Sequence, residues 1–460
     1  MAAYKEPGVY LRPVETVFAT PAAIGMYPCI IGCGARKFSV KSVAITRGED
    51  SASDPLTEYP STSSIVKIAN YDGGPSAYTA NTDYELTAQA GTTPAMVTWL
   101  TANAPTSGST YYVDLIYDVT DTSDVYDLTL ISSLAELHAK YGQNIRDAET
   151  NTPVNKLVAA AELVLRNNNE AYPVFIQQVK AQAETPTTAE FEEALAKTEF
   201  DERVWRIVPT DISTDIINAI ASSIARCSSY EERKERTAFV SYNGTASDFT
   251  DVMIKTGALA HDLANKRMCV FYPDTVTMTL VDGNDYTMSA QMIGAALAGR
   301  EQTFVASRSR TRMALTGIKA LNGVKMTRAQ MNQLAAVGVL IVTQENEGAN
   351  VVVRHQLTTD MTGVQTRELS IICISDYCAK AFRASCESYI GVYNITPETI
   401  SMIDGTLKIV ISTLSGNNII INGSVTSVVQ STESPDTVLA TVRVSVPYPC
   451  NYIDITMYLD

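Results

Sequence analysis

The sequence has few of the groups on which enzyme chemistry depends. Only three histidines occur among 460 residues, and the chain contains neither a G-x-S-x-G nucleophile motif nor a G-x-x-x-x-G-K-[ST] phosphate-binding loop. The first motif positions the serine of many hydrolases, and the second cradles the phosphates of nucleotide-driven motors. We therefore predict a structural subunit and not an enzyme, with no catalytic residue and no cofactor.

Long hydrophobic runs and an excess of positive charge are also missing. No run approaches the roughly 20 apolar residues of a membrane-spanning helix, and the first residues lack the basic and apolar regions of a secretory signal. The 35 Lys and Arg residues are outnumbered by 50 Asp and Glu, which gives a net charge of −15. Such a surface repels phosphate backbones and anionic lipids. We expect no nucleic-acid partner, no direct membrane insertion and synthesis in a cytosol.

The eight cysteines include no C-x-x-C pair. Most of them lie within apolar runs, which indicates buried thiols in a reducing compartment. The alternative is a metal site built from Cys373, Cys378 and Cys386. Zinc sites usually combine close cysteine pairs with several histidines, and this chain has few of either. We predict no metal site.

Three other features permit a chemical interpretation and a plainer one. The aspartates spaced every third residue in 118–127 could bind calcium, but an EF-hand loop also needs a glycine and a closing glutamate, so a solvated acidic loop is favoured. Residues 32–36 lack the third glycine of a dinucleotide-binding loop, which favours a plain turn. His261 lies on a predicted amphipathic helix, where a solvated or core-edge histidine is far more common than a catalytic one.

What is present indicates a large globular protein. Apolar residues make up 45% of the chain and charged residues 18%, and a chain of this length is expected to form roughly two to four domains. From residue 132 to about 298, strands alternate with helices, a pattern typical of βαβ units around a mostly parallel sheet. The predicted helices span 132–141, 153–167, 187–197, 214–228, 248–264, 289–298, 327–336 and 374–390. The predicted strands span 27–32, 171–179, 203–209, 236–242, 267–272, 339–343 and 351–355, with later turns at 415–418 and 421–424.

Residues 47–130 have a different composition. Thr, Ser, Asp, Tyr and Gly dominate, and alternating runs such as 64–68 and 110–115 are separated by turn-forming residues such as Asp72-Gly73-Gly74. Short alternating strands broken by turns are typical of a small antiparallel sandwich or barrel. We predict a β-rich inserted domain.

Both ends of the chain have an extended pattern. Pro7, Pro13 and Pro21 disfavour a helix and a central strand near the start. Near the end, Ile453, Ile455, Met457 and Leu459 alternate with polar or aromatic residues, as in a β-strand with one apolar face. No later strand exists to pair with it. It must join a sheet of its own chain or a sheet of another molecule, and the pattern leaves both possibilities open.

Together these patterns predict an α/β and α+β multidomain fold. Its parts are an N-terminal linker arm (1–20), a core domain (21–46 with 340–446), the β-rich insertion (47–130), an α/β domain with a mostly parallel sheet (131–339) and a C-terminal β-strand arm (447–460).

Short motifs at both ends resemble those of contractile tail sheath proteins. The opening pattern Y-x-x-P-G-V-Y is formed by Tyr4, Pro7, Gly8, Val9 and Tyr10. The region from about 340 to 460 is similar to the C-terminal pattern of that family, whereas the middle matches only by its α/β alternation and 47–130 shows no match. The matching groups are Val352-Val353-Arg354, Leu357-Thr358-Thr359-Asp360, Arg367-Glu368-Leu369, Asp376-Tyr377, Gly391-Val392-Tyr393-Asn394, Val446-Pro447-Tyr448 and Ile453-Asp454-Ile455-Thr456.

The resemblance implies a structural protein of a phage tail, assembled in the host bacterial cytoplasm. Sheath subunits stack as rings around an inner tube, linked by exchanged terminal strands, and contract from a metastable extended state to drive the tube through the target envelope. The implied partners are further copies of the chain, the inner tail tube protein, and the baseplate and tail-terminator proteins. A sheath of a related injection or secretion device is the near alternative, and an α/β hydrolase with a β-domain is the alternative from another class.

The resemblance also implies roles for particular segments. Residues 340–446 and the arms would form the inner layer, and 47–130 would project outward. Lys380, Arg383 and Glu387, spaced along one predicted helix, are candidates for facing the tube, although an ordinary solvent-facing side explains them equally well. The linking residues would be Tyr4, Pro7, Gly8, Val9, Tyr10, Tyr452, Ile453, Ile455, Met457 and Leu459.

Overall fold

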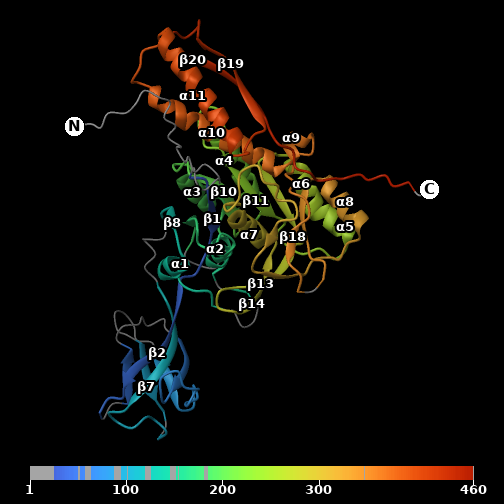
Figure 1. Cartoon of the computed structure of the whole chain (residues 1–460). Helices are drawn as coiled ribbons and strands as arrows, with labels where there is room; N and C mark the ends of the chain where they lie inside the picture. The colour runs from blue at the N-terminus through green and yellow to red at the C-terminus, as the bar shows by residue number, and fades with distance from the viewer. Residues whose placement is uncertain are drawn as a thin grey trace, which may run out of the picture. The chain divides into compact units, whose positions relative to one another are not determined.

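The computed structural model describes residues 25–49, 52–56, 64–87, 95–100, 102–119, 126–145, 152–153, 155–180, 185–346 and 348–458 (Figure 1). By their contacts these residues form two compact units. The α/β unit contains the described residues of 27–303 and 309–369. The C-terminal unit contains residues 25–26, 304–308 and 370–458.

A nine-stranded sheet organises the α/β unit, in the order β15-β18-β17-β12-β11-β10-β1-β9-β8. The strands from β9 to β17 are parallel to their neighbours, and antiparallel strands complete both edges. The central strands are buried along nearly their whole length, as expected where helices cover both faces of a parallel sheet. The strands are β1 (Tyr27–Gly32), β8 (Thr129–Ile131), β9 (Val174–Gln178), β10 (Val204–Pro209), β11 (Thr237–Ser241), β12 (Met268–Tyr272), β15 (Ala314–Leu315), β17 (Val339–Thr343) and β18 (Val351–Val353).

Helices pack on both faces of this sheet (Figure 1). One hydrophobic cluster joins Phe191 of α3, Ile220 of α4 and Leu334 of α8 to the strands, whereas α2 and α7 pack against each other and against β1. The helices are α1 (Leu134–Tyr141), α2 (Lys156–Asn167), α3 (Thr188–Thr198), α4 (Thr214–Cys227), α5 (Phe249–Val252), α6 (Ala258–Leu263), α7 (Gln291–Glu301), α8 (Arg328–Ala336) and α9 (Val364–Arg367). A π-helical turn, η2 (Met253–Gly257), connects α5 to α6. A small antiparallel sheet of β14 (Asp285–Ser289), β13 (Thr275–Thr279) and β16 (Ile318–Leu321) completes the unit.

The inserted β-region forms two three-stranded antiparallel sheets, β2-β7-β4 and β3-β6-β5. Its own core contains Leu56, Trp99 and Val113. At its centre the Asp54 carboxylate accepts hydrogen bonds from the Trp99 indole (2.9 Å) and the Tyr111 hydroxyl (3.0 Å). The strands are β2 (Lys37–Thr46), β3 (Ser53–Leu56), β4 (Ser64–Ala69), β5 (Tyr84–Thr87), β6 (Ala95–Trp99) and β7 (Thr110–Asp118). The region therefore begins at Lys37, ten residues before the predicted boundary, because the long strand β2 pairs with β7.

The C-terminal unit is built from two long helices and a β-hairpin. The helices are α10 (Leu369–Cys386), which continues into the short 3-10 helix η3 (Glu387–Tyr389), and α11 (Pro397–Gly416). The hairpin consists of β19 (Asn422–Gln430) and β20 (Val438–Ser445). Thr396 caps α11 and Pro397 occupies its first turn, a favourable arrangement for a helix start.

The broad prediction of an α/β multidomain fold is confirmed, and the parallel sheet holds most of the predicted strands. The division between the predicted domains differs. The prediction groups residues 21–46 with 340–446, but β1 lies inside the parallel sheet between β10 and β9, and β17 extends the same sheet beyond β12. Helix α11 was not predicted, and residues 422–424 of the turn predicted at 421–424 form the start of β19. Periodicity identifies a strand, but it does not say which neighbours the strand will pair with.

Candidate assembly surface

The place where α/β sheets usually bind ligands is filled by the protein itself. In such sheets the ligand lies at the carboxyl ends of the strands where the strand order reverses, which here is beside β1. The Asp211 carboxylate accepts a hydrogen bond from the Cys33 amide at 2.7 Å. A Cβ at Gly32 would lie 1.8 Å from the Thr210 hydroxyl oxygen. Burial raises the pKa of Asp211 and raises the pKa of the Cys33 thiol to about 12. The predicted plain turn at 32–36 therefore closes this end of the sheet.

This close packing gives a stability prediction. We expect Gly32→Ala to lower the free energy of unfolding by about 2–3 kcal/mol, because the added methyl group overlaps Thr210. Urea denaturation followed by circular dichroism measures the change. Gly405→Ala is the matched control, since no atom lies within 4 Å of its Cβ position in α11. Equal stability of the two variants would contradict the close approach at Gly32.

The three histidines have structural partners or face solvent. His138 Nε2 lies 2.7 Å from the buried Glu162 carboxylate, and His355 Nε2 lies 2.9 Å from the buried Glu368 carboxylate. The His261 side chain is 75% exposed on α6 beside Asp262. The prediction of a solvated His261 is confirmed.

Six of the cysteines are buried, as predicted for structural thiols, while Cys386 is half-buried and Cys450 is exposed. Burial raises the thiol pKa of Cys269 and Cys378 to about 12, so these thiols are unreactive near neutral pH. In the part of the chain that the structure describes, no group of three possible metal ligands occurs. Within the acidic stretch 118–127, Asp118 pairs with Lys37 at 2.8 Å and Asp127 is exposed, while residues 120–125 lie outside the described residues.

No helix among the described residues is long and apolar enough to cross a membrane.

The hairpin β19–β20 of the C-terminal unit has unpaired edges. It is a sheet of two strands, and no third strand joins either edge within residues 348–458. Val429 and Leu439 lie opposite each other on it, and their side chains are 51% and 52% exposed. Unpaired edges with exposed β-branched side chains readily accept another strand. The hairpin therefore presents two unpaired strand edges among the described residues.

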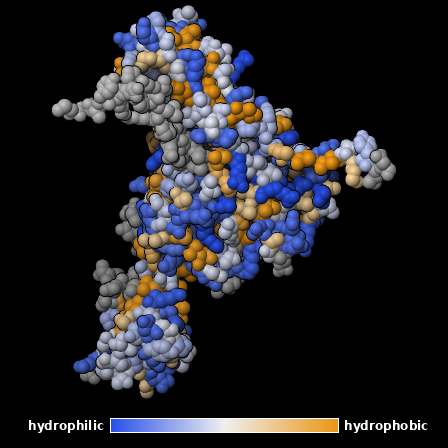
Figure 2. All heavy atoms as spheres, viewed as in Figure 1, coloured by the Kyte–Doolittle hydropathy of each residue, from blue (hydrophilic) through white to orange (hydrophobic). Residues whose placement is uncertain are grey.

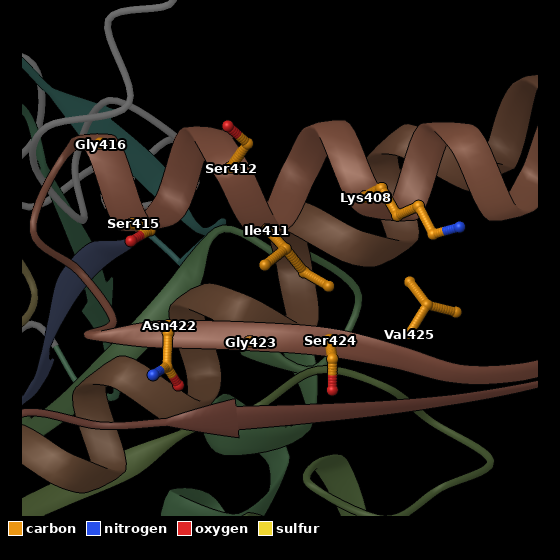
Figure 3. Close-up of a pocket in the computed structure, with 9 residues that line it drawn as sticks. All are labelled: Lys408, Ile411, Ser412, Ser415, Gly416, Asn422, Gly423, Ser424 and Val425. Atoms are coloured by element: carbon orange, nitrogen blue, oxygen red, sulfur yellow. The ribbon is translucent and has the colours of Figure 1, made fainter.

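A groove of about 690 Å³ lies between α11 and β19. Figure 3 shows Ile411 of α11 directed toward the strand, with Lys408 farther along the helix. Gly423 permits the close approach, because a Cβ there would lie 3.1 Å from an Ile411 methyl carbon. The residues lining the groove are Lys408, Ile411, Ser412, Ser415, Gly416, Asn422, Gly423, Ser424 and Val425. The groove thus combines an apolar floor with a polar rim and one cation.

Residues 446–458 continue directly from β20 as an extended segment without assigned secondary structure. The side chains of Ile453, Ile455 and Met457 are 79%, 80% and 74% exposed. Figure 2 shows hydrophobic atoms on the surface of this segment. The predicted terminal strand does not form in the isolated chain, because no strand of the described residues pairs with it. We call residues 446–458 the C-terminal arm.

The structure places the predicted site residues in two groups. Tyr452, Ile453, Ile455 and Met457 lie in the C-terminal arm, whereas Lys380 and Arg383 lie half-buried on α10 and Glu387 is exposed on η3. Tyr4, Pro7, Gly8, Val9, Tyr10 and Leu459 lie outside the described residues. The groove residues of α11 were not predicted, although the Thr396-Pro397 start and the helical spacing of apolar residues that follows were available as signals.

Comparison with known proteins gives one curated relative and several similar folds. No family model matches the chain. The "Tail sheath protein" of Mycobacterium phage Bxz1 is 24% identical over 304 residues, which cover 65% of this chain. The chain spans about half the length of this relative, since the match covers 50% of it.

Two solved structures share the fold over the whole of both chains. One is a chain of the anti-feeding prophage (AFP) baseplate, with a TM-score of 0.60 and 10% identity over 100% of each chain. The other is a chain of the AFP helical sheath in the contracted state, with a TM-score of 0.58 and 11% identity over 100% of each chain. At these identities the likeness concerns the fold alone.

Proposed function

We propose that this chain is a sheath subunit that polymerises around an inner tube and contracts to drive the tube through a cell envelope. Its resemblance to the contractile tail sheath family is confirmed by its relatives. The observation that carries the proposal is the exposed, alternating C-terminal arm beside a hairpin with open edges. A structural role of this kind requires no catalytic residue and no cofactor.

The arm supports linkage between subunits because it leaves apolar surface uncovered. Burying Ile453, Ile455 and Met457, which are now 74–80% exposed, would contribute about 1.5–3 kcal/mol each. Addition to a strand edge also satisfies backbone hydrogen bonds that a free segment leaves to water. Both gains favour binding of an arm from one copy to the hairpin of another, and they oppose the entropy lost on association.

The groove suggests how the incoming strand is oriented. A strand added to the outer edge of β19 would lie beside α11, with apolar side chains over Ile411. Lys408 pairs with Asp404 at 2.6 Å, and its side chain is 62% exposed, so an incoming carboxylate such as that of Asp454 would compete with Asp404 for this cation.

Assembly into stacked rings follows if both ends of each chain link different neighbours. The resemblance assigns this role to residues 1–20 together with the C-terminal arm. Contraction would then be a change between two packings of the same subunits. Pro447 and Pro449, at the root of the C-terminal arm, are proposed as the boundary at which the arm bends.

The proposed roles of the other segments, the partners and the location follow from the same proposal. Residues 340–446 form the inner layer, the β-rich insertion projects outward, and Lys380, Arg383 and Glu387 face the inner tube. The partners are further copies of the chain, the tail tube protein, the baseplate and the tail-terminator protein. The location is the virion tail, after assembly in the host bacterial cytoplasm. A sheath of a related injection device would use the same subunit chemistry.

Electron microscopy tests the proposal directly. The purified, concentrated protein, alone and with candidate tube protein, is expected to form hollow striated cylinders of uniform diameter in negative stain. Dispersed particles under both conditions would contradict polymerisation. In that case a covalent serine or cysteine probe applied to the α/β unit would test the hydrolase alternative.

A further inference from the structure

Residues 304–308 form a short loop with an unusual path. The chain leaves the α/β unit after Thr303 and returns to it at Ser309, but the contacts of the loop place it in the C-terminal unit. The guanidinium carbon of Arg308 lies 3.7 Å from the centre of the Phe304 ring, which closes the loop on itself. We call residues 304–308 the strut loop.

The tip of the strut loop contacts the turn between α11 and β19. The Ser307 hydroxyl donates a hydrogen bond to the Asn418 carbonyl oxygen at 2.6 Å, and Ala306 is fully buried. Asn418 has a positive φ of 57°, and the next residue, Ile419, is fully buried. This turn connects the two sides of the groove, so the strut loop touches the element that sets the distance between α11 and β19.

The base of the strut loop is fixed within the α/β unit by buried charges. Glu301, at the end of α7, and Arg310, just after the loop, form an ion pair at 3.1 Å with both side chains fully buried. The Glu301 carboxylate also pairs with the buried Arg206 of β10. The pair therefore joins the two ends of the loop to each other and anchors them to the central sheet.

The same network reaches the second place at which the chain leaves the α/β unit. The Arg310 amide donates to Gln356 Oε1 at 2.8 Å, and Gln356 Nε2 donates to Glu368 Oε2 at 3.1 Å. Glu368 is fully buried and immediately precedes α10, which passes into the C-terminal unit at Ser370. One buried network of ion pairs and hydrogen bonds thus holds both points at which the chain leaves the α/β unit.

We propose that the strut loop couples strand binding at the hairpin to the buried network of the α/β unit. A strand that enters the groove presses on the turn at Asn418, and the turn is tied through Ser307 to the base at Glu301 and Arg310. Packed interiors deform little, and hydrogen bonds among buried groups resist displacement. Arm exchange in the lattice would therefore reach the α/β unit of each subunit. This inference rests on the acceptor role of the hairpin in the proposed function.

Hydrogen exchange of the full-length, unassembled chain tests the coupling. Ser307→Ala removes the tip hydrogen bond and is expected to raise exchange in residues 417–421 about fivefold. Ala306→Glu places a charge in a buried position and is expected to raise hydrogen exchange in residues 417–421 about tenfold or more. If the loop couples the units, exchange also rises at 301–303 and 355–369. An effect confined to 417–421 would overturn the proposal, and Ser375→Ala, at an exposed position of α10, should change neither region.

A peptide probe separates this inference from the proposed function. A synthetic peptide of residues 448–458 is added to the chain, and exchange is measured again. The expected result is protection of 422–430 together with slower exchange at 355–369, the latter lost in Ser307→Ala. Protection of 422–430 with no change at 355–369 would overturn the coupling. No protection of 422–430 would contradict the acceptor role of the hairpin, and the exchange of the two tip variants then decides the coupling alone.

Discussion

Replacing Ile455 with aspartate is expected to abolish tube formation while leaving the subunit folded. The Ile455 side chain is 80% exposed, so the isolated chain gains little stability from it, and an exposed substitution usually changes the free energy of unfolding by less than about 0.5 kcal/mol. In the lattice the same side chain would be buried against a neighbouring hairpin. A carboxylate there would have to be desolvated without a designed partner, at a cost of several kcal/mol for each contact. If every subunit donates one arm, as proposed, that cost recurs throughout the polymer.

Negative-stain microscopy and the pelleted fraction after centrifugation measure assembly, and thermal denaturation measures folding. Val66→Asp is the matched control, because Val66 is a 59% exposed aliphatic residue in β4 of the inserted region. It is expected to assemble normally. Ile455→Val should also assemble, since it keeps an apolar β-branched side chain. Tubes formed by Ile455→Asp would exclude the arm from the lattice contact, and a melting temperature lowered by several degrees would place the arm in its own subunit's core.

The buried ion network predicts the largest effect on subunit stability. Glu301→Gln is expected to lower the free energy of unfolding by about 3–5 kcal/mol. The substitution removes the negative charge between two arginines, Arg206 and Arg310, whose side chains are fully buried. The neutral amide deprives both fully buried guanidinium groups of the carboxylate that they share. Urea denaturation of the full-length chain is the measurement.

An exposed ion pair provides the control. Glu345 lies 3.8 Å from Arg312, and both side chains are more than 70% exposed, so Glu345→Gln should change stability by less than about 1 kcal/mol. Joint replacement of Arg206, Glu301 and Arg310 by Met, Leu and Met removes all three charges. It is expected to recover much of the stability lost in Glu301→Gln. A small effect of Glu301→Gln, close to that of Glu345→Gln, would contradict the role assigned to the network.

The parallel sheet illustrates what can be predicted locally. Strands such as 203–209 and helices such as 214–228 were placed within a few residues, because a buried apolar run and a capped amphipathic helix are local properties. The helix predicted at 187–197 is α3, which begins with a capping box at Thr187. The position of β1 in the sheet was not predicted, because its pairing with β9 and β10 depends on residues more than 140 positions away.

For the assembly surface too, the local pattern was predictable and the long-range contacts were not. The alternating arm at 452–458 was evident from its period of two residues. Its acceptor was not, since α11 was missed and the groove forms only when that helix packs beside β19. Nor could spacing place Glu301, Arg310, Gln356 and Glu368 in one network, because their side chains meet only after the loop and the strands have folded around them.

The sequence by itself determined that this protein has a mixed α/β fold, that it lacks the motifs of an enzyme, and that its end resembles a strand in need of a partner. These are properties of composition and short-range order, which neighbouring residues decide. Only the tertiary structure decided that no strand among the described residues pairs with the arm, that an open hairpin lies at its root, and that buried charges secure the points at which the chain leaves the α/β unit. Each of those depends on contacts between distant residues, and their free energy exists only in the folded chain.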